Sequence, residues 1–308
     1  MVDGEVPAVM LAVRLHAPGD PARLVAEQLP TPRPGAGEAL VRVHAAAITR
    51  GELDWPADRL PAIPSYEFSG VVAAVGPGVE QVRVGEAVYA LGDFGRDGAA
   101  ADYTVVDAGL LAPKPRTLDH LQSAAIPLAG LGAWQGLFEH GRLAAGQRVL
   151  IHGAAGGVGA FAVQLAHWRG AHVVGTASTA NLETVRALGA DQVLDHTTTR
   201  FEDAVEPVDV VFDTAGGDRL ERSPAVLRPG GRLVSVAEEP PDAAGITASY
   251  FVVAPNRRQL VELAEAADRG ELRPVIDQVF PLGDARQAFE RSLGNHRPGK
   301  IVLRVAEG

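Results

Sequence analysis

A glycine-rich turn in the middle of the chain constrains the fold more than any other feature. The stretch HGAAGGVG, residues 152–159, follows the apolar run 147–151 and leads into the helical pattern 158–168. A second apolar run, 171–176, comes next. This order and spacing are typical of a strand–helix–strand unit that binds a dinucleotide at its turn. A tight turn without a ligand is the alternative.

Two glycines have separate tasks in such a turn. Gly156 lets the backbone approach a pyrophosphate, and Gly159 lets the helix pack closely against the strand. The N–H groups at the start of the helix then attract phosphate, aided by the helix dipole. Ala154 stands where the usual G-x-G-x-x-G pattern has its first glycine. We nevertheless predict a dinucleotide site here.

The rest of the chain divides into regions with different residue patterns. Roughly the first 115 residues hold short β-prone runs separated by Gly and Pro turn signals, which predict a barrel-like β domain. Strands and helices then alternate, and strand cores such as VDVVFD are almost continuously apolar. This pattern indicates a parallel, doubly wound sheet. The tail predicts helices within 255–272 and 284–293 and a last strand at 299–305.

Composition limits the classes of partner. The net charge is -10, from 28 basic and 38 acidic residues, so we expect neither a nucleic acid nor an anionic membrane. The chain has no cysteine, which excludes disulfides, thiolate nucleophiles and cysteine-containing zinc sites. We find no signal-peptide pattern and no apolar run approaching about 18 residues. We therefore expect a cytoplasmic protein, and its length predicts two domains.

The end of the second strand bears on the identity of the dinucleotide. Sites for NAD usually place Asp or Glu there to hold the ribose 2′-hydroxyl. In GTASTANLE, residues 175–183, no acid precedes Glu183. Ser178 and Asn181 can instead donate hydrogen bonds to a 2′-phosphate, although the loop has no Arg or Lys. We predict NADPH as the cofactor. Simple capping of the following helix is the alternative role for Ser178 and Asn181.

In these motifs the chain resembles a known family. HGAAGGVG resembles the signature of the zinc-independent medium-chain dehydrogenase/reductases of the quinone oxidoreductase-like branch. Residues 64–91 resemble the Gly-rich barrel segment of that family, and residues 124–153 resemble its domain junction. VDVVFDTAGG, LRPGGRLVSVA and residues 271–305 continue the match in order. The resemblance covers nearly the whole chain.

The resemblance implies an α/β fold in which a Rossmann doubly wound parallel sheet is inserted in a GroES-like (chaperonin-10-like) β-barrel catalytic domain. Residues 1–118 would form the first part of the catalytic domain, 119–249 the Rossmann NADP-binding domain, and 250–308 the return to the catalytic domain. The active site would lie in the cleft for a small-molecule substrate. Homodimers joined through the Rossmann sheet edges are usual in the family.

The resemblance also assigns the cofactor contacts, in four groups at the pyrophosphate, the 2′-phosphate, the ribose and the nicotinamide. The residues at the pyrophosphate would be Gly156, Gly157 and Val158, and those at the 2′-phosphate would be Ser178, Asn181 and His196. The residues at the ribose would be Thr214, Ala215 and Gly216, and those at the nicotinamide would be Val236, Ala237, Phe251 and Val253. His196 stands where the family often has a tyrosine, and a protonated imidazole would compensate for the missing lysine. A structural role for His196 is the alternative.

This chain departs from its relatives near the expected substrate. Zinc relatives have Gly-His-Glu where this chain has Ser65, Tyr66 and Glu67, so the ligand histidine is replaced and we expect no metal. Relatives commonly have Thr at Gly132. Thr49 also replaces an Asn of the family. These changes leave the substrate undetermined.

Hydride transfer to a conjugated carbonyl needs little from the protein besides orientation, exclusion of water and a proton for the resulting enolate. We consider Tyr66 the first candidate for the proton donor because it occupies the former metal-ligand position. Glu52, which replaces an Asp of the family, and Asp54 are candidates for a proton relay. Packing of Tyr66 at a strand start, turn capping by Asp54, and a proton from water are the alternatives.

The sequence leaves three candidate functions open. The first is a zinc-independent, NADPH-dependent oxidoreductase that reduces quinones or α,β-unsaturated carbonyls. The second is an enoyl-thioester reductase related to the reductase modules of polyketide synthases in secondary metabolism, which would need a route for a long acyl chain and basic residues at the cleft mouth. The third is an NADPH-binding structural or regulatory protein.

Overall fold

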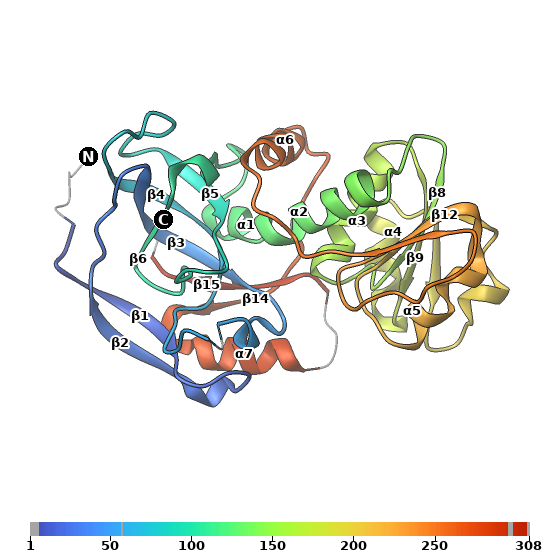
Figure 1. Ribbon diagram of the computed structural model, residues 1–308, viewed down its shortest axis with the longest axis horizontal. Coiled ribbons are helices and arrows are strands. Elements are labelled where there is room, and N and C mark those ends of the chain that lie inside the picture. Colours follow the sequence, from blue (N-terminus) through green and yellow to red (C-terminus); the bar gives the residue numbers. More distant parts are fainter. Residues whose placement is uncertain (1–5, 57, 295–297, 307–308) are drawn as a thin grey trace.

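The chain forms two lobes. The computed structural model describes residues 6–56, 58–294 and 298–306. Figure 1 shows the lobes side by side, with both chain ends on the lobe that the first residues build. That lobe holds a seven-stranded sheet and a separate two-stranded hairpin, and the other lobe holds a six-stranded sheet. In the described ranges no helix is long and apolar enough to cross a membrane.

The first lobe, called the barrel lobe below, is built around a mixed sheet in the order β14-β15-β3-β4-β5-β7, with β6 paired to β3. Its strands are β3 (Glu38–Ile48), β4 (Glu67–Val75), β5 (Ala87–Leu91), β6 (Tyr103–Asp107), β7 (Ala112–Pro113), β14 (Ile276–Pro281) and β15 (Lys300–Arg304), and the hairpin is β1 (Val9–Leu15) with β2 (Leu24–Pro30). The close approach of β3 and β4 requires Gly70, because a Cβ there would lie 2.1 Å from the carbonyl oxygen of Arg42.

The last strands of the chain belong to this sheet. β15 pairs antiparallel with β3, which places Ile301 opposite Ile48, and β14 pairs parallel with β15. Gly299 forms an isolated bridge to Gly156, and its N–H donates to the carbonyl of Ala155 at 2.9 Å. The end of the chain therefore connects the barrel lobe to the glycine-rich turn.

The second lobe, the Rossmann lobe, has six parallel strands in the order β10-β9-β8-β11-β12-β13. They are β8 (Arg148–His152), β9 (His172–Ala177), β10 (Gln192–Asp195), β11 (Val208–Asp213), β12 (Leu227–Ser235) and β13 (Thr247–Tyr250), with helices α3 (Gly157–Trp168), α4 (Leu182–Ala187) and α5 (Asp218–Arg222). The order reverses at β8, and ligands of such sheets bind at the carboxyl ends of the strands beside the reversal. The predicted fold class, a GroES-like domain with a doubly wound Rossmann sheet, is confirmed.

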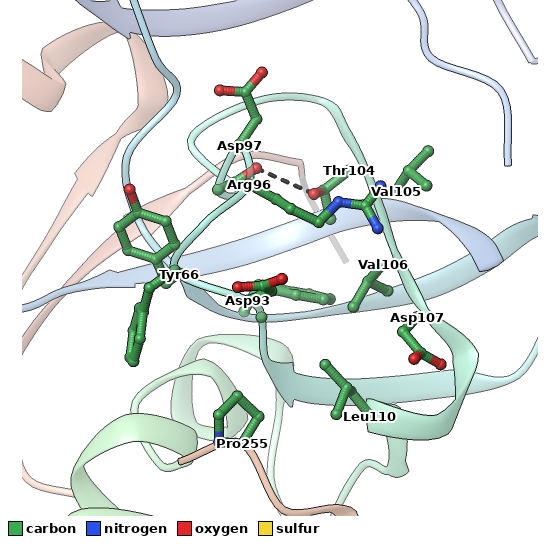
Figure 2. Close-up of a pocket in the computed structure, with 14 residues that line it drawn as sticks. Tyr66, Asp93, Arg96, Asp97, Thr104, Val105, Val106, Asp107, Leu110 and Pro255 are labelled. Carbon is green, nitrogen blue, oxygen red and sulfur yellow. Dashed lines mark hydrogen bonds between the residues drawn. The ribbon is translucent and has the colours of Figure 1, made fainter. Parts of the chain in front are cut away.

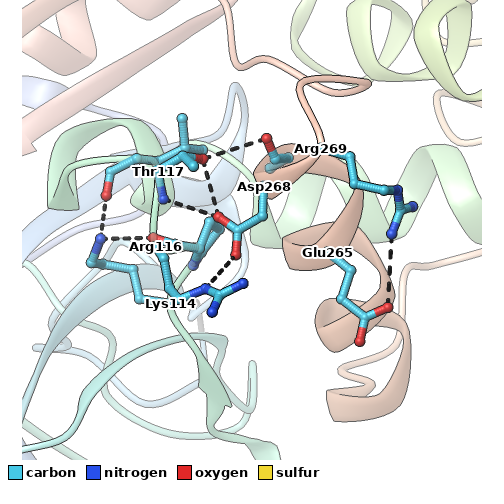
Figure 3. Close-up of polar contacts among 9 residues, drawn as sticks. Lys114, Arg116, Thr117, Glu265, Asp268 and Arg269 are labelled. Atoms are coloured by element: carbon cyan, nitrogen blue, oxygen red, sulfur yellow. Dashed lines mark hydrogen bonds and ion pairs between the residues drawn. The ribbon is translucent and has the colours of Figure 1, made fainter.

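Four further helices lie around the barrel sheet and the junction between the lobes. They are α1 (His120–Ala124), α2 (Pro127–Trp134), α6 (Arg257–Asp268) and α7 (Ala285–Leu293). The end of α6 is attached to the segment after β7, as Figure 3 shows. Asp268 accepts hydrogen bonds from the Thr117 N–H at 2.9 Å, from the Thr117 hydroxyl at 3.0 Å and from Arg116 Nε at 3.2 Å.

One helix differs from its prediction. The pattern predicts a helix from Pro127 to Gly141, but α2 ends at Trp134 and a π-helical turn follows over Gln135–His140. Gly136 lies against the Phe212 ring, where a Cβ would be 2.4 Å from the nearest ring carbon. The packing of this turn on β11, which the local sequence does not reveal, accompanies the change of helix type.

Candidate active site

A cleft of about 1130 Å³ lies between the two lobes. Its walls are the glycine-rich turn, the carboxyl ends of strands β9 to β12, the loop after β3 and the start of β15. We call it the interlobe cleft. Its volume exceeds the roughly 300–1,000 Å³ that is usual for one small ligand, so it has room for a dinucleotide together with a substrate.

The glycine-rich turn has the geometry that a pyrophosphate requires. Gly156 is the N-cap of α3, and no side chain caps the N–H groups of this helix. A Cβ on Gly159 would lie 2.1 Å from the carbonyl oxygen of Gly153, so glycine is obligatory there. Ala154 fits because its Cβ faces Gly175 of β9, which has none. The methyl group of Ala154 therefore occupies the space that Gly175 leaves free, and the shape of the turn is unchanged.

Nearly all of the predicted cofactor residues line the interlobe cleft. They are Gly156, Gly157, Val158, Ser178, Asn181, His196, Thr214, Ala215, Val236, Ala237, Phe251 and Val253. Gly216 lies outside the lining, in a turn with φ +70° where its N–H donates to Asp213 at 2.9 Å. Contact of these residues with a cofactor remains a prediction.

The sequence analysis missed one cation at the nucleotide end of the cleft. Arg219, the second residue of α5, lines the cleft beyond the strand ends. In the described part of the chain its buried Nε atom has no hydrogen-bond partner. The loop after β9, where a contact with a 2′-phosphate is expected, has no Arg or Lys, whereas Arg219 follows β11. An arginine in the first turn of that later helix is the signal that could have found it.

His152 holds the elements around Arg219 in place. It is buried at the end of β8, and its ring nitrogens lie 3.1 Å from the Thr176 hydroxyl and 3.1 Å from the Ser223 hydroxyl. Burial, with a smaller contribution from the Arg219 charge, lowers the pKa of His152 to about 3, so its imidazole is neutral. Thr176 lines the cleft, and His152 thus connects β8, β9 and the 3₁₀ turn that directly follows α5 at this end.

The carboxylate nearest in sequence to His196 is Asp195, at the end of β10. Hydrogen bonds from the hydroxyls of Thr179 and Thr197 lower the pKa of Asp195, so it is ionised. It is not among the residues that line the interlobe cleft. The lining at this end therefore carries Arg219, His196 and neutral polar groups, together with one carboxylate, Glu238, which accepts a hydrogen bond from the Gly217 N–H at 3.1 Å.

Tyr66 lies beside the interlobe cleft and not in its lining. It borders a smaller cavity of about 360 Å³ in the barrel lobe, with Val106 and Leu110 on the opposite side (Figure 2). Its hydroxyl accepts a hydrogen bond from Arg59 at 2.8 Å, and burial raises the pKa of Tyr66 to about 12. Phe94 lines both cavities and packs edge-on against the Tyr66 ring at 5.4 Å.

The other two predicted catalytic residues are also outside the cleft lining. Glu52 is buried, and its carboxyl oxygens accept hydrogen bonds from the N–H groups of Thr49 and Ser65 at 3.0 and 3.1 Å. Burial raises the pKa of Glu52 to about 8. Asp54 is exposed. Glu52 lies close to Tyr66, because it accepts from the N–H of Ser65 and its charge acts on the Tyr66 hydroxyl. None of the three side chains lines the interlobe cleft, and the catalytic roles of Tyr66, Glu52 and Asp54 stay predictions.

A buried ion pair that the sequence analysis missed lies at the base of the cleft. The Lys300 ammonium is 2.5 Å from Glu67 Oε1 and donates to the Thr49 hydroxyl at 2.9 Å. Glu67 Oε2 accepts from the N–H of Leu128 at 2.9 Å. Lys300, Thr49 and Leu128 all line the cleft. These residues are far apart in the sequence, and only the pairing of β15 with β3 brings Lys300 to Thr49.

The residues present do not fit a zinc ion. In the described ranges no group of three or more His, Cys, Asp or Glu side chains is placed to hold a metal. Glu67 is already paired with the Lys300 ammonium, and the Tyr66 hydroxyl is bound by Arg59. A cation at this position would meet an ammonium group at short range.

Comparison with known proteins agrees with this architecture. Two family models match, "Alcohol dehydrogenase GroES-like domain" over residues 35–116 and "Zinc-binding dehydrogenase" over residues 188–303. An NADPH-dependent alkenal/one oxidoreductase of Arabidopsis thaliana chloroplasts is 36% identical over 285 residues, which cover 86% of this chain and 72% of that protein. The spectinabilin polyketide synthase system protein NorB of Streptomyces orinoci is 38% identical over 255 residues, covering 77% of this chain but 12% of that much longer protein.

Solved structures give the same result for the whole chain. The quinone oxidoreductase from Coxiella burnetii superimposes with a TM-score of 0.89 at 32% identity, covering 97% of this chain and 100% of that one. The fold, the cleft and these relatives together imply an oxidoreductase with a cofactor of the NAD(P)H type. The chain belongs to the medium-chain dehydrogenase/reductase superfamily, in its quinone oxidoreductase and alkenal reductase-like group.

Proposed function

We propose that this protein is an NADPH-dependent reductase of α,β-unsaturated carbonyl compounds or quinones. The observation that carries the proposal is the interlobe cleft, in which a phosphate-binding turn and an apolar end occur together. That apolar end is lined by Leu128, Val236, Phe251 and Val253. When bound, NADPH would supply a hydride, and the protein would orient the substrate and exclude water.

The preference for NADPH rests on charge at the nucleotide end. Arg219 lines the cleft with an unpartnered, buried Nε within the described residues, and no acid follows β9 before Glu183. An arginine suits a phosphate because its guanidinium is always charged and offers several N–H donors in one plane. Ser178 and Asn181 line the same end and can donate further hydrogen bonds.

Aromatic side chains at the substrate end favour flat, conjugated substrates. Trp55 and Phe94 both line the cleft, with ring centroids 5.1 Å apart in an edge-on arrangement. Trp55 is 40% exposed, so its ring offers a free surface. Conjugated carbonyls and quinones are planar, and aromatic rings pack well against such molecules.

The direct test follows NADPH absorbance with a panel of acceptors: a benzoquinone, a simple enone and a saturated ketone. We expect turnover of the first two and none of the ketone, with NADPH preferred over NADH. Tight NADPH binding without turnover of any acceptor would favour the third function, that of an NADPH-binding structural or regulatory protein. Equal use of NADH would contradict the cofactor assignment alone.

An enoyl-thioester reductase is the second candidate, because a segment of a polyketide synthase protein is 38% identical to this chain. Such an enzyme needs basic residues where the carrier of the acyl chain enters. Arg50 lines the cleft and is exposed, and Arg291 lines it as well. A crotonyl thioester added to the panel separates the candidates, because a thioester reductase would turn it over faster than the simple enone.

For the assembly we propose a homodimer joined through the edge of the Rossmann sheet. β13 is the edge strand of this sheet and ends at Tyr250, and Val252 follows two residues later. Tyr250 and Val252 are 38% and 66% exposed, and both also border the interlobe cleft. An unpaired strand edge with apolar side chains is a ready surface for pairing with a second copy. Light scattering on the purified protein, with Val252→Glu as a disrupting variant, tests this assembly.

A further inference from the structure

Reduction of a conjugated carbonyl creates negative charge on its oxygen, so the substrate end of the cleft needs a group that receives this charge. Among the described residues, four Lys or Arg side chains line the cleft: Arg50, Arg219, Arg291 and Lys300. Arg219 lies at the nucleotide end, and Arg291 is held by Asp277 in two hydrogen bonds of 2.6 and 3.0 Å. Arg50 is exposed, whereas Lys300 is 5% exposed. Lys300 is thus the most deeply buried cation of this set.

The backbone fixes the place of Lys300. Its strand pairs with β3 so that Ile301 lies opposite Ile48, next to Thr49. On the other side its aliphatic stem runs past Gly157, where a Cβ would be 2.8 Å from Lys300 Cδ. The side chain therefore extends from the phosphate-binding turn to the Thr49 hydroxyl. That path lies along the base of the cleft, between the positions expected for cofactor and substrate.

The ammonium keeps a donor for a further acceptor. An ammonium has three N–H groups, and in the described part of the chain its contacts are Glu67 at 2.5 Å and Thr49 at 2.9 Å. Glu67 is 1% exposed at its side chain and compensates the buried charge. The Thr49 hydroxyl donates to Glu67 Oε1 at 3.3 Å in this structure, and rotation about its C–O bond would turn that proton to another acceptor. An oxygen atom in the cleft can therefore interact with this ammonium directly or, after that rotation, through the Thr49 hydroxyl.

The choice of lysine also favours a role in proton transfer. Of the 28 Lys and Arg residues, only Lys114 and Lys300 are lysines. Arginine forms stronger bidentate pairs with carboxylates but does not release a proton in proteins, whereas the ammonium of a lysine can act as a proton donor. A chain that uses arginine almost everywhere has a lysine at this buried position in the cleft lining.

Resting on the proposed function, we propose that Lys300, acting through Thr49, stabilises and protonates the carbonyl oxygen of the substrate during reduction. Hydride addition to the β-carbon forms a C–H bond, shifts the C=C electron pair to the α-carbon–carbonyl bond and moves the C=O pair onto oxygen. The oxygen takes the Thr49 hydroxyl proton as Thr49 takes one from Lys300 Nζ. Water then reprotonates Lys300, and the enol tautomerises to the saturated ketone.

Kinetics of two variants test this role. Lys300→Met should lower kcat/KM for an enone about 100-fold, the usual contribution of a positioned acid, and Thr49→Val about tenfold, with Kd for NADPH changed less than threefold. The other lysine supplies the matched control, because Lys114→Met removes an ammonium that is bound to backbone carbonyls outside the cleft lining. An enone kcat/KM within threefold of wild type in Lys300→Met would overturn the proposal.

A second readout needs no turnover. 4-Nitrophenol carries an acidic oxygen like that of an enol, and its absorbance reports its ionisation. Bound to wild type with NADP⁺, it should ionise at least tenfold more readily than in water, and Lys300→Met should abolish this shift. Lys300→Arg should retain the shift but leave enone reduction low, because arginine keeps the charge and not the proton donor. Full activity of Lys300→Arg would contradict proton donation.

Two further points keep the test decisive. Lys300→Met leaves Glu67 as an unpaired buried charge and can unfold the protein, so the double variant Lys300→Met/Glu67→Gln, which removes both charges, repeats the phenol titration. A wild type that reduces neither enones nor quinones contradicts the proposed function alone. The phenol titration still decides about Lys300 in that case, and an unshifted phenol in folded wild type overturns the oxyanion site.

Discussion

The two ends of the interlobe cleft offer different kinds of group to a charged ligand. At the nucleotide end, the glycine-rich turn offers backbone N–H groups and space, and small residues such as Gly156 and Gly159 make the approach possible. At the substrate end, the charges are side chains, and Lys300 with Glu67 forms a buried pair. At the first end, glycines leave room for a ligand because they have no side chains. The second end contains two side-chain charges that compensate each other. Substitutions should therefore affect the two ends in different ways.

The largest effect is expected at the substrate end. Glu67→Gln leaves the Lys300 ammonium without its counter-ion, and breaking a buried pair costs about 3–5 kcal/mol in the free energy of unfolding. The matched control is Glu290→Gln, which breaks the exposed pair of Arg286 and Glu290 and should cost about 0–1 kcal/mol. Denaturant unfolding measures both. Equal losses in the free energy of unfolding would mean that the buried pair stabilises the protein no more than the exposed pair does.

Glu52 gives the substrate end a pH dependence. Burial raises its pKa in the folded protein from 4.5 to about 8, so the folded state holds this proton more tightly than the unfolded state. Stability should thus fall as pH rises from about 4.5 to 8 and level off above it. Since one pKa unit is about 1.4 kcal/mol, a shift from 4.5 to about 8 corresponds to a loss on the order of 5 kcal/mol.

The measurement compares wild type with Glu52→Gln in denaturant at several pH values. The variant lacks the titrating group, so its stability should improve relative to wild type across this range. Glu239→Gln, at an exposed position, serves as the control and should track wild type. Parallel curves for wild type and Glu52→Gln would contradict the prediction.

At the nucleotide end, an added methyl group should be harmful. Gly159→Ala places a Cβ 2.1 Å from the carbonyl oxygen of Gly153, and such overpacking costs about 1–3 kcal/mol. NADPH affinity should fall as well, because the turn must shift. Gly283→Ala has no described atom within 4 Å of its Cβ and should leave both quantities unchanged. Thermal unfolding and NADPH fluorescence report the two effects.

The smallest expected effect sharpens the cofactor assignment. Arg219→Gln should weaken NADPH binding about tenfold, near 1.4 kcal/mol, and leave NADH binding unchanged. Arg222→Gln is the control, because Arg222 lies one turn later in the same segment and pairs with Glu202. Titration with both nucleotides measures the change. A parallel loss for NADH would assign Arg219 to the adenine or ribose and not to the 2′-phosphate.

The sequence predicts an end of the cleft well when the residues that form it are close together along the chain. The phosphate-binding turn lies within eight residues, so a local pattern describes it, and the alternation of strands and helices predicts the sheet around it. The accommodation of Ala154 needs Gly175 on the next strand, and Arg219 comes from a later helix. These contacts depend on the packing of neighbouring strands, which a local pattern does not contain.

The substrate end lies further beyond the reach of local patterns. Lys300 and Thr49 are 251 positions apart, and their contact depends on the register of β15 against β3. The placement of Tyr66 depends on contacts with Arg59, which binds its hydroxyl, and with Phe94, which packs edge-on against its ring, and Tyr66 borders a separate cavity. Residue type pointed to Tyr66 and Glu52 as ionisable groups near the site, but it did not show which side chains face the cleft.

The bridge between Gly299 and Gly156 has a consequence for movement between the lobes. Gly299 directly precedes β15 of the barrel sheet, and Lys300, which begins β15, packs against Gly157 at the start of α3. The glycine-rich turn of one lobe is therefore held partly by the sheet of the other. A displacement of one lobe against the other would have to break this bridge, and the turn would be the first part of the Rossmann lobe to feel it.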